Sequence, residues 1–283
     1  MKKIGYGAAL LSAQLLCGVA TASMVDLNDW TAESYEAVSG FGAGSWSVSG
    51  DGSSVTQTVN GQPTIFYSDF NAYGTETTGS IRVASGSGDD DYIGFVLGFQ
   101  PGDTTNTLAD YLLIDWKRAS QSFNFSSPSD SPGGLAPRGL AISQVYGIPD
   151  ADELWQHENL AGTPVGSGVT ELARADTLGD TGWAFGVDYE FSFDFGPNNL
   201  DVWVDDVLEF SLEGTFGDGR LGFYNFSQAG VIYSAFNLEA GSFPVPIGDD
   251  PVVDPVAVPE PASLALLGMG LLAMAGMMRR RRV

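Results

Sequence analysis

The chain has 283 residues, 43% of them hydrophobic, which is enough for a substantial buried core in one or two domains and excludes disorder throughout. Its 37 glycines and 12% aromatic residues favour an all-β domain with many turns over a helical protein. A formal net charge of −23 excludes nucleic acid as a partner, because an acidic surface repels phosphates and attracts divalent cations.

Residues 1–22 have the pattern of a signal peptide for export. A basic start is followed by an apolar run and a small-x-small cleavage sequence, which are Lys2-Lys3, residues 8–20 and Ala20-Thr21-Ala22. The chain's one cysteine, Cys17, lies inside this segment, so the exported protein has no disulfide. Core burial or a bound metal must stabilise it instead.

The body, residues 23–242, holds roughly a dozen short β-prone segments separated by turn signals. After one or two edge strands within 24–50, we predict strands over 54–59, 64–67, 80–84, 92–99, 111–117, 140–146, 189–195, 200–204, 208–212, 220–226 and 231–238. Residues 92–99 and 111–117 should form one hairpin, and 189–195 and 200–204 another. Residues 151–159 predict a short helix or an irregular turn. This spacing is typical of a β-sandwich or jelly roll.

Three consecutive acids, Asp89, Asp90 and Asp91 (the acid triplet), run directly into the strand at 92–99. Within that strand, alternation places Ile93, Phe95, Leu97 and Phe99 on one face. Adjacent carboxylates repel one another, and a hard cation such as calcium, which takes roughly six to eight oxygen ligands, relieves the repulsion. A solvated acidic turn is the alternative.

The C-terminal part contains a linker and a predicted transmembrane helix. Residues 243–258 are rich in proline and aspartate and predict an extended spacer. The apolar run 262–278 is just long enough to span a bilayer, with Arg279, Arg280, Arg281 and Arg282 on the cytoplasmic side. We expect this helix to be the protein's one contact with the membrane. The arginines argue against a buried core helix.

Pro259, Glu260 and Pro261, the apolar helix and the terminal arginines together resemble the PEP-CTERM sorting signal of Gram-negative bacteria that produce exopolysaccharide. The resemblance covers residues 259–283. It implies that an exosortase recognises this tail and cuts near the Pro-Glu-Pro motif, so that anchoring in the inner membrane is transient. The expected destination is secretion to the cell surface or to the extracellular (biofilm) matrix.

The body is more acidic than the whole chain. The terminal segments hold six of the 12 basic residues and one of the 35 acidic ones, which leaves 34 acids against six bases and a net charge near −28. Such a surface attracts divalent cations. Adaptation to salty water would produce the same composition.

The body also resembles the thrombospondin C-terminal domain over roughly residues 50 to 240. The resemblance is carried by Gln57-Thr58-Val59-Asn60, Asp69-Phe70-Asn71, Asp89 to Gln100, Trp116-Lys117, Leu154-Trp155, Gly182-Trp183, Gly219-Arg220-Leu221-Gly222-Phe223 and Phe226-Ser227-Gln228. It implies a lectin-like β-sandwich that binds calcium, with the acid triplet contributing to the metal site. We add Asp69 and Asn71 as candidates to complete the oxygen shell. The chain departs from the family in lacking body cysteines and an upstream array of Asp-rich repeats.

The predicted function is that of a calcium-binding adhesive or matrix component without enzymatic activity. The alternative is a lectin for exopolysaccharide or surface glycans, with Trp46, Trp155 and Trp203 as stacking candidates. A glycoside hydrolase is less favoured, because Asp201 and Asp205 are separated by about 13 Å along a strand. The one histidine, His157, lacks the context of a serine nucleophile, so we interpret it as a core or surface residue.

Overall fold

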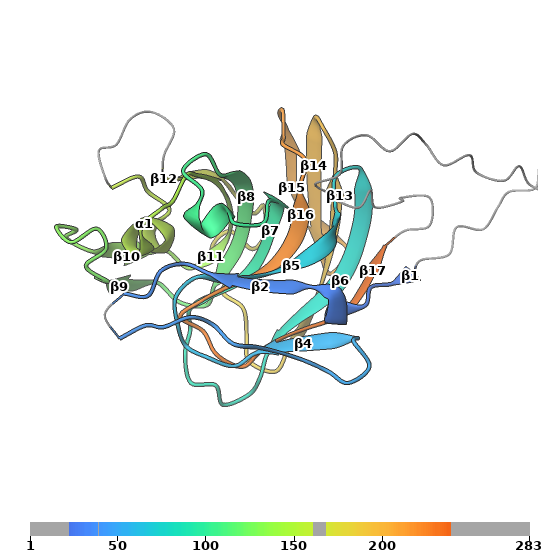
Figure 1. Ribbon diagram of the computed structural model, residues 1–283, viewed down its shortest axis with the longest axis horizontal. Coiled ribbons are helices and arrows are strands. Elements are labelled where there is room, and N and C mark those ends of the chain that lie inside the picture. Colours follow the sequence, from blue (N-terminus) through green and yellow to red (C-terminus); the bar gives the residue numbers. More distant parts are fainter. Residues whose placement is uncertain (1–22, 39, 161–167, 239–283) are drawn as a thin grey trace, which may run out of the picture. The chain divides into compact units, whose positions relative to one another are not determined.

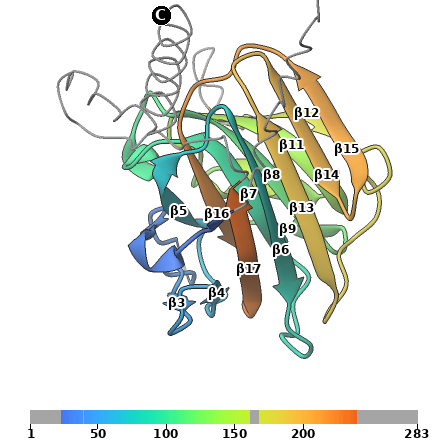
Figure 2. The same cartoon turned by 90° about the vertical axis from the view of Figure 1, so that its right-hand side faces the viewer.

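The computed structural model describes residues 23–38, 40–160 and 168–238, which form a β-sandwich (Figure 1). One sheet has eight strands in these residues, in the order β15 (Val207–Glu213), β14 (Asn199–Val204), β13 (Asp188–Phe195), β6 (Thr75–Val83), β17 (Val231–Leu238), β4 (Ser54–Gln57) and β3 (Trp46–Val48), with β1 (Ser23–Met24) also paired to β17. Figure 2 shows β15, β14, β13, β6 and β17 side by side.

The other sheet has seven strands in the described residues, in the order β12 (Gly168–Arg174), β11 (Gly139–Tyr146), β8 (Asp110–Lys117), β7 (Tyr92–Phe99), β16 (Arg220–Phe226), β5 (Thr64–Asn71) and β2 (Thr31–Ser34). A ribbon of β9 (Gln121–Phe123) and β10 (Gly134–Ala136), helix α1 (Ala151–Gln156) and 3-10 turns at Leu27–Asp29 and Asp103–Thr105 complete the fold. Both predicted hairpins, β7–β8 and β13–β14, are present. The all-β sandwich is therefore confirmed.

Aromatic side chains fill the space between the two sheets. Phe191, Phe193 and Phe195 of β13 are all buried there, as their alternation with polar residues predicts. Phe223 of β16 stacks on Tyr233 of β17 with ring centroids 4.4 Å apart, so this pair joins the two sheets directly.

A second apolar cluster covers the outer face of the seven-stranded sheet. Tyr92 and Val96 of β7 pack there with Leu154 and Trp155 of α1 and with Ala136 of the β9–β10 ribbon. All eight residues of β7 are consequently buried. Both faces of this strand are therefore buried.

Phe99 does not share a face with Ile93, Phe95 and Leu97, so that part of the sequence prediction was wrong. Gly98 has φ +81, and the register with β16 shifts at this point, which is a β-bulge. The extra residue reverses the alternation, and Phe99 lies in the outer cluster.

Strand β4 ends at Gln57 instead of residue 59. The Gln57 side chain accepts a hydrogen bond from the Val59 N–H at 3.0 Å and donates one to the Val59 carbonyl at 2.6 Å. These bonds take the place of strand-to-strand hydrogen bonds at Val59. Strand β5 runs on to Asn71, beyond the predicted end at 67. Within residues 151–159 the helical alternative is confirmed, and Glu153 Oε2 accepts a hydrogen bond from the N–H of Asp150 at the helix start.

The described residues all belong to one compact unit. The predicted signal peptide, linker, Pro-Glu-Pro motif and helix over 262–278 lie outside the described residues. Among the described residues, no helix is long and apolar enough to cross a membrane.

Candidate functional site

The acid triplet lies in the loop between β6 and β7, at the start of β7. Ligand oxygens of Asp89, Asp90 and Asp91 all lie within 4.8 Å of one another. A calcium ion binds oxygens at about 2.3–2.6 Å, so ligands on opposite sides of one ion can be up to about 5 Å apart. The three carboxylates therefore fit around a single calcium ion.

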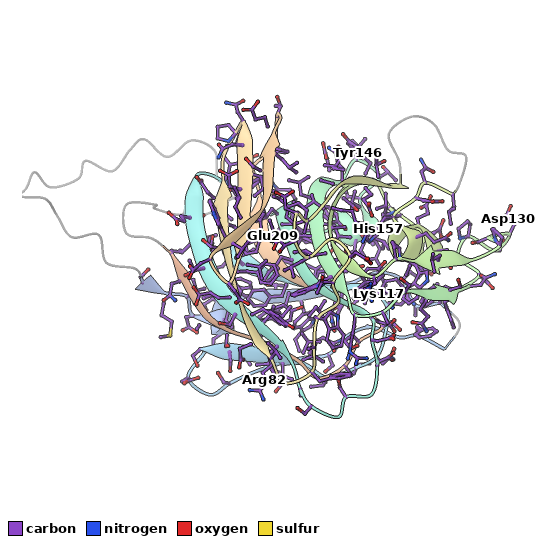
Figure 3. All side chains as sticks on the ribbon, turned by 180° about the vertical axis from the view of Figure 1, so that it is seen from behind. Arg82, Lys117, Asp130, Tyr146, His157 and Glu209 are labelled. Atoms are coloured by element: carbon purple, nitrogen blue, oxygen red, sulfur yellow. The ribbon has the colours of Figure 1, made fainter. Side chains whose placement is uncertain are left out.

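Lys117, which is labelled in Figure 3, is fully buried and lies beside the triplet. Its Nζ is 2.5 Å from Asp91 Oδ1 and 3.8 Å from Asp90 Oδ1. The pairing of β7 with β8 puts Lys117 opposite Tyr92 and so next to the triplet. Three carboxylates against one ammonium leave two negative charges, the charge that one divalent cation balances.

Burial raises the pKa of Asp91 to about 6, although the Lys117 ammonium opposes the shift, and the Asp89 charge adds to it. The raised pKa means that the ionised form of Asp91 is poorly stabilised by its surroundings. A cation bound to this carboxylate would stabilise its ionised form.

Several of the scattered segments that carry the family resemblance converge on the triplet. Asn60 Nδ2 donates to Asp89 Oδ2 at 2.5 Å, and the N–H of Asp91 donates to Gln228 Oε1 at 3.1 Å. The indole N–H of Trp183 donates to the Asp91 carbonyl at 3.0 Å. These contacts come from three different loops, so the tertiary fold holds the triplet in place.

Asp69 and Asn71 are not brought to the triplet, which corrects the predicted completion of the oxygen shell. Asn71 lies opposite Arg220, which pairs with Phe99, whereas Tyr92 begins β7 at the other end of the sheet. Seven strand residues separate these ends by about 23 Å. Asn71 Oδ1 instead accepts hydrogen bonds from the N–H groups of Tyr73 and Gly219.

Sequence reasoning missed a buried ionic network around His157. Its Nε2 lies 3.0 Å from Asp115 Oδ2, and its Nδ1 lies 3.2 Å from Glu171 Oε2. Burial lowers the pKa of His157, but the Asp115 charge and hydrogen bond and those of Glu171 outweigh burial and raise this pKa to about 9. The network ties the end of α1 to β8 and β12, and Figure 3 labels His157 at its centre. A lone histidine far from both acids in sequence carries no signal of it.

Burial of Glu171 raises its pKa, but hydrogen bonds from His157 and Arg174 outweigh this and lower the pKa to about 2. Arg174 holds Glu171 through two bonds of 2.8 and 3.0 Å. Glu171 thus stays ionised and supports the charged form of His157.

The residues considered for catalysis and sugar stacking have other surroundings. Asp205 lies beyond the end of β14 in a turn with φ +49, so it shares no strand face with Asp201. Trp155 is buried in the outer cluster, and Trp46 is half-buried with its N–H bonded to Thr64 Oγ1 at 2.9 Å. Trp203 is half-buried on β14.

Comparison with known proteins agrees with the resemblance read from the sequence. The chain is 27% identical over 199 residues to thrombospondin-3b of Danio rerio, covering 67% of this chain and 20% of the relative. It is 24% identical over 201 residues to bovine (Bos taurus) cartilage oligomeric matrix protein, covering 67% and 24%. The chain thus spans a quarter or less of the length of these relatives.

Among solved structures, the carbohydrate-binding module CBM66 of Bacillus subtilis is similar with a TM-score of 0.46 and 10% identity, covering 71% of this chain and 96% of that one. Residues 257–282 match the PEP-CTERM protein-sorting motif. Residues 42–241 match the family described as the thrombospondin C-terminal region. The chain therefore belongs to the thrombospondin C-terminal family and carries a PEP-CTERM sorting motif at its C-terminal end.

Proposed function

We propose that this protein is an exported calcium-binding β-sandwich that acts as an adhesive or structural component of the cell surface or extracellular matrix, without enzymatic activity. The observation that carries the proposal is the acid triplet, whose carboxylates lie within 4.8 Å of one another and retain two negative charges beside Lys117. Asp89, Asp90 and Asp91 would hold the ion, with water completing the shell. Calcium there would fasten the β6–β7 loop to the start of β7.

The test is the melting temperature of the chain with millimolar calcium and with a chelator. We expect calcium to raise it in the wild-type chain and to have little effect in the double variant Asp89→Asn with Asp90→Asn. The matched control is Asp130→Asn with Asp206→Asn, which removes the same charge from two exposed acids. If control and triplet variants lose the calcium effect equally, general attraction to an acidic surface explains it, and the site is wrong.

Sorting by an exosortase rests on the Pro-Glu-Pro motif and the terminal arginines. We propose that cleavage near Pro259-Glu260-Pro261 releases the body from the inner membrane to the surface or matrix. Replacing Glu260 by alanine should leave the uncleaved chain in the membrane fraction. Equal release of variant and wild type would contradict this role.

A second candidate function, binding of exopolysaccharide or surface glycans, is favoured by one observation. A pocket with aromatic and polar side chains opens beside Asp89 and Asp91. Saturable binding to a glycan array would support a lectin. If no glycan binds, the structural role is the only proposed function that remains.

A further inference from the structure

A cavity of about 150 Å³ lies next to the acid triplet. Its lining divides into an aromatic group, made of Phe41, Phe123, Phe125 and Trp155, and a polar group, made of Asn60, Asp89, Asp91, Gln121 and Ser227. Small-molecule sites combine these features, an apolar surface and a few convergent polar groups that fix orientation. Asp69 and Asn71 take no part in it.

The aromatic group is firmly packed and still offers a free surface. Phe123 contacts Phe125 and Phe41 edge-on, with ring centroids 4.6 and 5.9 Å apart. Phe125 in turn contacts Trp155 at 5.4 Å. Phe123 is nevertheless 39% exposed, on the short strand β9. A ring held in place by its neighbours and open to solvent can stack on the apolar face of a ligand at little entropic cost.

The polar group can both donate and accept hydrogen bonds. The Gln121 side-chain amide supplies donors, which favours a ligand that brings acceptor oxygens. The carboxylates of Asp89 and Asp91 are acceptors and favour a ligand that also brings donors.

A hydroxyl group supplies both an acceptor and a donor, whereas an ammonium group supplies donors alone. With calcium bound at the triplet, as proposed above, the two negative charges left beside Lys117 are balanced, so a cationic ligand meets no unpaired carboxylate there. An acidic ligand would meet two carboxylates in the cavity and a strongly acidic body. These charges leave a neutral polyhydroxyl compound as the fitting ligand.

We infer that this cavity binds one ring of a neutral saccharide, with the ring's C–H face on Phe123 and its hydroxyls toward Asp89, Asp91 and Gln121. The cavity is smaller than the roughly 300–1,000 Å³ of typical small-molecule sites, which suits a single sugar unit of a glycan. The inference rests on the second candidate function and adds to it the ligand class and the residues.

The test measures binding of the full chain, in calcium-containing buffer, to immobilised neutral oligosaccharides of glucose, galactose, mannose and N-acetylglucosamine. We expect Phe123→Ala to bind at least tenfold more weakly than wild type. The matched control Leu172→Ala, at a residue 43% exposed, should bind as wild type does. Undiminished binding by Phe123→Ala overturns the cavity as the site and leaves saccharide binding intact, whereas no binding by the wild-type chain overturns saccharide binding itself.

A second measurement uses the wild-type chain and so does not depend on the folding of a variant at the site. The indole N–H resonance of Trp155, whose ring lines the cavity, can be assigned from its nuclear Overhauser contacts in the wild-type chain and should shift when the bound oligosaccharide is added. An unchanged resonance at saturation overturns the assignment.

Discussion

Replacing Lys117 by methionine removes the buried ammonium beside the acid triplet and keeps an unbranched apolar side chain. The Nζ atom lies 2.5 Å from Asp91 Oδ1, and both side chains are almost entirely shielded from water. Removing one partner of a buried ion pair costs about 3–5 kcal/mol, because the other charge stays buried and unpaired. For a domain of this size, 1 kcal/mol corresponds to about 2–4 °C. The melting temperature in chelator should therefore fall by roughly 6–20 °C.

Calcium should rescue this variant more than it stabilises the wild type. Without the ammonium, the triplet carries three uncompensated charges instead of two, so calcium binds more tightly. At saturating calcium, each tenfold gain in affinity adds about 1.4 kcal/mol to stability. Lys117→Met should thus show a larger calcium-induced rise in melting temperature than the wild-type chain.

The assay is thermal unfolding of wild type and variant, each in chelator and in calcium. The control is Arg82→Met, which removes one partner of the ion pair with Asp188 at 3.7 Å, where the two side chains are 42% and 64% exposed. Exposed pairs contribute about 0–1 kcal/mol, so this control should melt close to wild type. An equal calcium effect in wild type and Lys117→Met would refute calcium binding at the triplet.

Three further predictions follow from the structure. The pKa of His157 is raised from 6.5 to about 9, so its stabilising effect is complete below pH 6.5 and is lost as pH rises through 9. Urea unfolding should show that the free energy of unfolding falls by on the order of 3 kcal/mol between pH 6 and 10, and that His157→Gln abolishes this fall. An equal fall in the variant would contradict the prediction. A Cβ at Gly94 would lie 2.0 Å from the Ile114 carbonyl oxygen, so Gly94→Ala should lower unfolding free energy by about 3 kcal/mol or more, whereas Gly50→Ala, with open space around it, should change it little. Asp69→Ala should leave the calcium-induced melting shift unchanged, and a reduced shift would reinstate Asp69 as a ligand.

The fold class was predictable because strand alternation is a local property. Two adjacent β-prone segments, 189–195 and 200–204, predicted the β13–β14 hairpin, and the structure has it. The bulge at Gly98 was not predictable in the same way. It depends on how β7 pairs with β16, a strand more than a hundred residues away in the chain.

The acid triplet could be singled out from the sequence because its three members are adjacent. Its surroundings could not, since Lys117, Asn60 and Gln228 reach it from separate segments. Asp69 and Asn71 appeared suitable by residue type alone, and the direction of β5 carries them to the far end of the sheet. A ligand set assembled from distant segments requires the strand pairing to be known.

By itself, the sequence determined the period of the strands, the acidity of the body and the positions of the triplet and the Pro-Glu-Pro motif. Each of these follows from composition or from neighbouring residues, without knowledge of how the chain folds. The tertiary structure alone decided that a lysine neutralises part of the triplet, that His157 joins Asp115 to Glu171, and that Phe123 and Trp155 line a cavity beside Asp89. These contacts depend on register and on the packing of loops over the outer sheet face, which are set by non-local pairing.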